Sequence, residues 1–115
     1  MAHYRESFSL DLPVTSVTNT CQSAFQEIGW SVKESTTGFV LKEPFKLKWS
    51  QLLVIRYPAT VRVSVAAESQ NRTLVDMQGS NLGFGPVQSN HVKKRVADLR
   101  GAIEHFALES QAQRE

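Results

Sequence analysis

The stretch that decides the fold is residues 92–106, which read VKKRVADLRGAIEHF. Its apolar residues recur at alternating steps of four and three, the spacing of one face of an α-helix. The residues on that face are Val92, Val96, Leu99, Ile103 and Phe106. We therefore expect an amphipathic C-terminal helix that packs along this stripe and runs to about Glu109, followed by a frayed tail at about 111–115.

The N-terminal region predicts one strand and one helix. Phe8, Leu10 and Leu12 alternate with polar residues, as in a half-buried strand, and Pro13 ends the alternation. Apolar residues then recur at steps of three and four up to Gly29, which suits a left-handed helix cap. The apolar residues of this expected helix are Val14, Val17, Cys21, Phe25 and Ile28.

Between the two helices the sequence shows strand patterns only. They cover residues 30–35, 38–42, 45–50, 52–57, 61–65 and 73–79. The connections between them are short, which favours antiparallel pairing. We expect a single α+β domain over residues 1–115, in the order β-α-β(4–5)-α. Its curved antiparallel sheet of five to six strands would pack on the long C-terminal helix as a second layer.

Composition sets limits on the class of protein. The 115 residues are 41% hydrophobic and 21% charged, which is typical of a globular chain. The net charge of +2 does not by itself indicate a nucleic-acid partner. The longest apolar run, Leu52 to Ile55, is far shorter than the roughly 20 residues of a membrane span. With no secretory signal visible and a single cysteine, a cytoplasmic location is the simplest prediction.

The order of elements resembles a known topology. The segment Phe8–Pro13 leading into the first helix, together with the final helix over Val92–Phe106, resembles the helix-grip and TATA-binding-protein-like topology in a single copy. Bet v 1-like and START-like ligand carriers are elaborated members of that group. Small uncharacterised bacterial domains with a similar Gly29-Trp30 pair, Trp49 and residues 99–104 resemble this chain as well.

This resemblance implies a binding function in a groove between the sheet and the last helix. The ligand would be apolar or amphipathic, or the groove would receive a protein partner. Residues that the sequence places on the apolar faces are the groove candidates: Trp30, Leu47, Trp49, Ile55, Val63, Met77, Leu99, Ile103 and Phe106.

A second hypothesis is an interaction module that binds nucleic acid or another polyanion. Lys93, Lys94 and Arg95 crowd the first half of the final helix, where the helix dipole disfavours positive charge. With His91 they form the candidate anion-binding set, to which Lys46 and Lys48 are possible additions. The simpler explanation is that acidic residues elsewhere in the fold neutralise these charges, and the sequence leaves both explanations open.

The sequence gives no catalytic constellation. None of the three histidines has a partner at metal-ligand or base–nucleophile spacing, so we predict no metal site and no cofactor. Cys21 lies on an apolar stripe, where a thiol is a small core residue. Gly83–Pro86 precedes a helix but lacks the known phosphate-loop patterns, and predicts a tight bend. An enzyme is therefore less favoured than a binding domain. Homodimerisation stays open.

Overall fold

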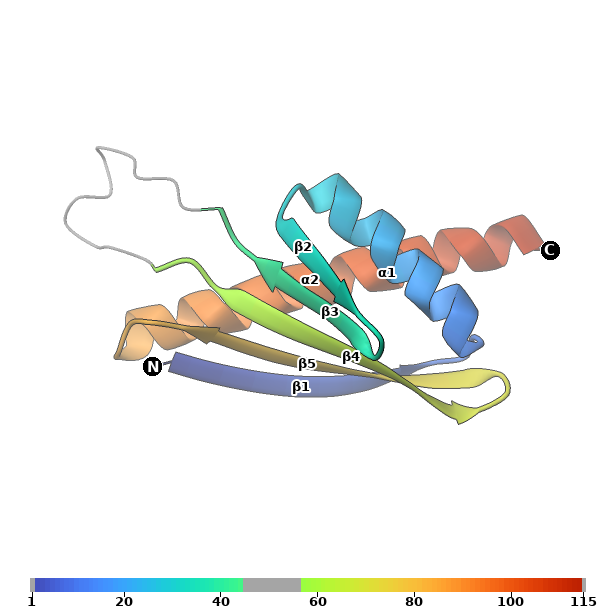
Figure 1. Ribbon diagram of the computed structural model, residues 1–115, viewed down its shortest axis with the longest axis horizontal. Coiled ribbons are helices and arrows are strands. Elements are labelled where there is room, and N and C mark those ends of the chain that lie inside the picture. Colours follow the sequence, from blue (N-terminus) through green and yellow to red (C-terminus); the bar gives the residue numbers. More distant parts are fainter. Residues whose placement is uncertain (1, 45–56, 115) are drawn as a thin grey trace.

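The structure, a computed structural model, describes residues 2–44 and 57–114 of the chain. Five strands and two helices follow one another in the expected order (Figure 1). They are β1 (Ala2–Leu10), α1 (Val14–Ile28), β2 (Ser31–Ser35), β3 (Gly38–Lys42), β4 (Thr60–Ser69), β5 (Arg72–Asn81) and α2 (Pro86–Arg114). Neither helix in this part of the chain is long and apolar enough to cross a membrane.

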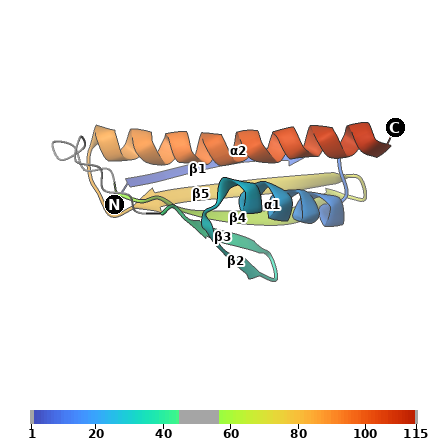
Figure 2. The ribbon, with the colours of Figure 1, turned by 90° about the horizontal axis from the view of Figure 1, so that it is seen from above.

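The five strands form one antiparallel sheet in the order β1-β5-β4-β3-β2. The first strand therefore lies beside the last strand, and the β2–β3 hairpin forms the opposite edge. The sheet curves, and α2 runs along it as a second layer (Figures 1 and 2). This confirms the predicted two-layer α+β architecture with a long C-terminal helix.

Both helices pack on the same face of the sheet, which we call the inner face. Helix α2 contacts β1 and β5, whereas α1 contacts α2, β4 and β5. The expected stripe of α2 is fully buried at Val92, Val96, Leu99 and Ile103, and Phe106 is partly buried. The 3.6-residue period of the sequence therefore identified the packing face of α2 correctly.

Helix α1 contributes a second group of buried residues to the core. Val17, Cys21, Ala24 and Phe25 are fully buried. The Phe25 ring meets the Phe39 ring of β3 edge-on, with ring centroids 5.3 Å apart. Gly29 ends the helix at φ 81°, as predicted, and its N–H donates to the Phe25 carbonyl oxygen. Because this backbone region is strained for other residues, glycine suits the position.

Several element boundaries differ from the expectation. Strand β1 begins at Ala2, earlier than the apolar alternation that starts at Phe8. The sequence pattern missed this start because Glu6, on the inner face, interrupts the alternation. Its carboxylate accepts a hydrogen bond from the Tyr4 hydroxyl at 3.0 Å and lies 3.5 Å from Arg100 Nη1 of α2. Helix α2 continues to Arg114, beyond the expected end at about Glu109. Only Gln70 and Asn71 connect β4 to β5.

The strand patterns over 45–50 and 52–56 lie outside the described residues. Tyr57, which ends the second pattern, is not in a strand.

Helix α2 approaches the sheet closely at Gly79 of β5. A Cβ added there would lie 2.7 Å from Val92 Cγ1 and 2.7 Å from Val96 Cγ2, closer than methyl groups tolerate. The absence of a side chain at Gly79 therefore allows the first turns of α2 to seat on β5.

We predict that Gly79→Ala lowers the free energy of unfolding by about 1–3 kcal/mol, because the new methyl group overpacks this contact. The matched control is Gly101→Ala on the exposed side of α2, where an added Cβ would meet nothing within 4 Å. That change should raise the free energy of unfolding by about 0.4–1 kcal/mol. Urea unfolding followed by circular dichroism measures both, and equal effects at the two positions would contradict the packing.

Candidate functional site

One end of the molecule exposes a group of large apolar side chains. Leu82 and Phe84 lie in the loop between β5 and α2 and are 72% and 83% exposed. Tyr57 and Val87 are 39% and 45% exposed beside them. Tyr57 lies against Gly83, which stands between Leu82 and Phe84 in the chain, because a Cβ added to Gly83 would be 2.9 Å from Tyr57 Cδ2. Val87 follows in the first turn of α2, and these four residues define the surface. We call this surface the apolar end.

The buried side-chain amides of Asn81 and Gln88 hold the loop between β5 and α2 in place. The Asn81 amide nitrogen donates to Gln88 Oε1 at 3.2 Å and to the Tyr57 carbonyl oxygen at 3.4 Å. Gln88 Oε1 also accepts the Tyr57 backbone N–H, and Asn81 Oδ1 accepts the Gly83 N–H. Asn81 and Gln88, which we call the amide bracket, thus join β5, α2 and the segment before β4.

A partly buried ionic cluster lies on the same part of α2. Glu43 follows β3, and its Oε1 is 2.6 Å from His91 Nε2 and accepts the Ala59 N–H at 3.1 Å. Its Oε2 is 2.6 Å from Arg95 Nε, in an ion pair without directed hydrogen-bond geometry. Because the carboxylate is an acceptor, His91 Nε2 is the donor. The cluster links α2 to the two segments that flank residues 45–56, through Glu43 before them and Ala59 after them.

The predicted anion-binding residues are therefore divided. His91 and Arg95 already contact the carboxylate of Glu43, and Arg95 also pairs with Asp98 at 2.7 Å. Lys93 and Lys94 stay exposed, and the Lys93 ammonium lies 5.9 Å from the centre of the Tyr4 ring. Of the two explanations for this basic run, internal neutralisation accounts for His91 and Arg95.

The predicted groove residues also divide into groups. Val63, Met77, Leu99 and Ile103 come together, and each is at most 1% exposed. They belong to the packed core, so a ligand would reach them only if α2 moved off the sheet. Trp30 and Phe106 are partly buried against that core. Leu47, Trp49 and Ile55, as well as Lys46 and Lys48, lie outside the described residues.

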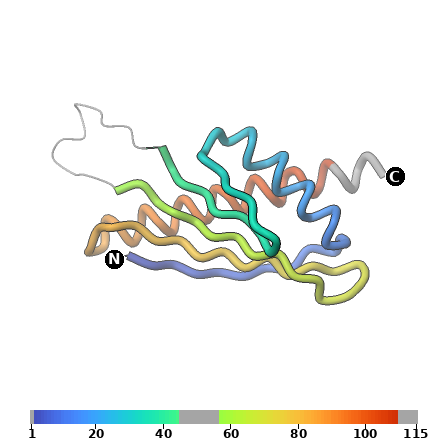
Figure 3. The backbone as a smooth tube through the Cα atoms, viewed as in Figure 1, coloured from blue at the N-terminus to red at the C-terminus, as the bar shows by residue number. Residues whose placement is uncertain are grey.

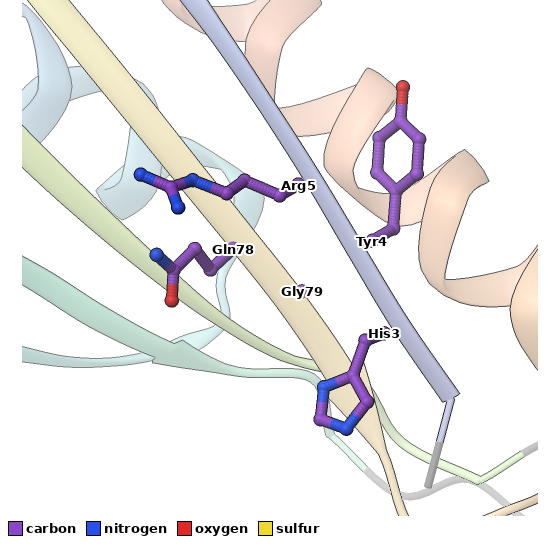
Figure 4. Close-up of a pocket in the computed structure, with 5 residues that line it drawn as sticks. All are labelled: His3, Tyr4, Arg5, Gln78 and Gly79. Carbon is purple, nitrogen blue, oxygen red and sulfur yellow. The ribbon is translucent and has the colours of Figure 1, made fainter.

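The two larger of the described hollows lie elsewhere on the surface. One of about 460 Å³ runs between α1 and the β2–β3 hairpin, beside Trp30, Val32 and Phe39. The other, of about 310 Å³, is a shallow depression over β1 and β5. Figure 4 shows His3, Arg5 and Gln78 projecting on one side of these strands, while Tyr4 points toward α2.

Within residues 2–44 and 57–114 we find no cluster of three acidic, histidine or cysteine residues that suits a metal ion. Cys21 is fully buried on α1, and burial raises the pKa of its thiol to about 12. A thiol with so high a pKa is a weak nucleophile at neutral pH.

Known proteins match this chain in structure but not in sequence. No protein-family model matches the sequence, and no curated protein matches it. XoxI from Bacillus cereus has a similar structure, with a TM-score of 0.57 and 12% identity over 100% of this chain and 99% of that chain. The chain is a small α+β domain of that fold.

Two further solved structures agree. An uncharacterised protein from Bacillus thuringiensis gives a TM-score of 0.53 at 14% identity, over 93% of this chain and 99% of that chain. A protein from Thermobifida fusca gives 0.51 at 12% identity, over 92% and 93% of the two chains. At this level of identity the likeness establishes the fold and no activity.

Sequence reasoning did not identify the apolar end, the amide bracket or Glu43. An available signal was Phe84 between two glycines, because a large apolar residue in a glycine-rich loop has no regular element in which to pack. The partners of Glu43 and Asn81 had no such signal. His91 is 48 positions from Glu43 along the chain, and only the fold brings the two together.

We predict that Glu43→Gln lowers the free energy of unfolding by about 1–3 kcal/mol, because it weakens the contacts of the carboxylate with His91 and Arg95. Glu34→Gln is the matched control. Glu34 is exposed on β2 and accepts a hydrogen bond from Gln22. Because the site is exposed, removing the charge of Glu34 should change the free energy of unfolding by less than about 0.5 kcal/mol. Urea unfolding of both variants tests this, and similar losses would show that the cluster does not hold the fold.

We predict that Cys21 resists a thiol reagent such as Ellman's reagent at pH 8 while the chain is folded. Its reaction should be on the order of a hundredfold slower than in urea-unfolded protein, because folding removes both access and thiolate. Its folded pKa exceeds the unfolded value near 9.0, so its contribution to stability is present below pH 9 and is lost as the pH rises toward 12. Rapid labelling of folded protein would contradict the burial.

Proposed function

We propose that this chain is a non-catalytic protein-binding domain that inserts its apolar end into an apolar pocket of a protein partner. The observation that carries this proposal is the exposure of Leu82 and Phe84, at 72% and 83%, on a loop held in place by the buried amide bracket. Covering large apolar side chains that protrude in this way removes apolar area from water and so favours association with another surface.

The geometry favours a protein over a small ligand. Sites for small molecules are concave and enclose most of the ligand, whereas Leu82 and Phe84 project outward. Protein interfaces are commonly dominated by a few large anchors that fill pockets of the partner. Binding of an apolar or amphipathic ligand between the sheet and α2 remains the alternative, and it requires the buried residues Met77 and Leu99 to separate.

The amide bracket supports the proposal energetically. A loop that orders only on binding loses conformational entropy at that moment, which lowers affinity. Asn81 and Gln88 are 4% and 7% exposed, and their hydrogen bonds fix the backbone of Tyr57 and Gly83 before any partner arrives. The apolar end is therefore preorganised.

The topology of the fold, the cellular location and the oligomeric state are part of the same proposal. We infer a single-copy helix-grip topology, because one long final helix follows an antiparallel sheet and packs on its concave side. A cytoplasmic location and a homodimer remain predictions, and a second copy of this chain is one partner that the apolar end would suit.

We predict that the apolar end captures a partner in the cells that produce the protein. A photoreactive benzoylphenylalanine replaces Phe84, and in a matched control it replaces Leu108, which is 66% exposed on α2. A partner that crosslinks from position 84 and not from position 108 is then purified. The Leu82→Ser/Phe84→Ser variant should weaken its binding at least tenfold, while Leu108→Ser leaves the affinity unchanged.

The outcomes separate clearly. A crosslinked dimer of this chain that dissociates in the double variant identifies the partner as a second copy. Absence of a specific crosslink at position 84, or equal affinities of the variants, would refute the proposal. Circular dichroism checks that the substituted proteins fold.

A further inference from the structure

The face of the sheet opposite the helices has a chemistry of its own. Both helices pack on the inner face, and among the described residues no element covers the other side, which we call the outer face (Figures 1 and 2). Its side chains are mainly charged or small and polar. The exposed ones include Arg5, Ser7, Lys33, Lys42, Arg62, Ser64 and Gln78.

Strand register aligns cations across this face. Arg5, Gln78, Arg62, Val40 and Lys33 are successive partners on β1, β5, β4, β3 and β2. With about 4.8 Å between strands, this row spans about 19 Å, and its cations recur about 10 Å apart. Lys42 lies on the same face in the neighbouring row, opposite Thr60.

The positive charges on the outer face exceed the negative ones. Arg5 donates two hydrogen bonds to Asp76, at 3.1 and 2.9 Å, and this pairing lowers the pKa of Asp76. That pair is neutral overall. Lys33, Lys42 and Arg62 are exposed and have no carboxylate within ion-pair distance among the described residues. Three positive charges are thus left over.

The remaining groups are hydrogen-bond donors suited to phosphate oxygens. Ser, Thr, Gln, Lys and Arg side chains are among those that donate hydrogen bonds to nucleic-acid phosphates. The shallow hollow beside His3, Arg5 and Gln78 opens on this face, next to the row of cations (Figure 4). The described outer positions carry no Phe, Tyr or Trp, so they offer neither a stacking platform for unpaired bases nor aromatic anchors for a membrane interface.

We propose that the outer face binds the phosphate backbone of a nucleic-acid duplex, independently of base sequence. The charge excess attracts phosphates, and a duplex needs no aromatic platform because its bases are already stacked on each other. The Arg5–Asp76 pair limits the strength of this site by neutralising a fourth cation. The proposal concerns a different surface from the apolar end and does not depend on it.

Fluorescence anisotropy with a labelled 20-base-pair DNA duplex tests the proposal between 50 and 200 mM salt. Three phosphate contacts predict that log K falls with log salt at a slope of about −2.7. Lys33→Gln/Arg62→Gln should reduce the slope by about two, and Asp76→Asn, which frees Arg5, should steepen it by about one. Lys93→Gln/Lys94→Gln on α2 is the matched control and should leave the slope unchanged.

Other results would overturn the proposal. These are no binding at 50 mM salt with 100 µM protein, loss of binding in the α2 control instead of the sheet variant, or a preference of more than tenfold for single-stranded DNA. Anionic phosphatidylserine vesicles serve as a second probe. Vesicle binding that depends on Lys33 and Arg62, without duplex binding, would assign the face to membranes and refute the assignment to nucleic acid.

Discussion

The contact between the apolar stripe of α2 and β5 is the interaction on which the rest of the structure depends. Val92 and Val96 seat against the bare backbone of Gly79, and Leu99 and Ile103 continue the same stripe into the core. This contact fixes both the height of α2 above the sheet and its position along it. The loop that carries Leu82 and Phe84 is thereby confined between two rigid elements.

Buried polar groups add hydrogen bonds to the apolar packing at that end of the molecule. A buried amide or carboxylate is costly unless its hydrogen-bonding groups are satisfied. Asn81, Gln88 and Glu43 meet this requirement through partners on α2 and on the segments flanking residues 45–56. The hydrogen bonds of Asn81 and Gln88 also hold the backbone of Tyr57 and Gly83, so these two buried amides both stabilise the fold and fix the loop of the apolar end.

The sequence predicted the elements that depend on periodicity. The stripe of α2, the apolar residues of α1, its cap at Gly29 and the β2–β3 hairpin all follow from local patterns, and each is present. The sequence predicted less where the environment of a residue depends on a partner far away along the chain. Glu6 obscured the start of β1 because Arg100 faces it, and His91 and Arg95 suggested an anion site because Glu43 was not visible as their neighbour.

The order of elements and the packing faces of both helices were determined by the sequence alone, because side-chain period and turn chemistry act over a few residues. Tertiary structure alone decided which charges are paired and which apolar residues are left uncovered. Lys33 and Arg62 share a row with Arg5 only because register aligns three strands that are distant in the chain. Phe84 is 83% exposed in a loop whose neighbouring Gly83 N–H is held by Asn81, and no local pattern in the sequence announces that contact.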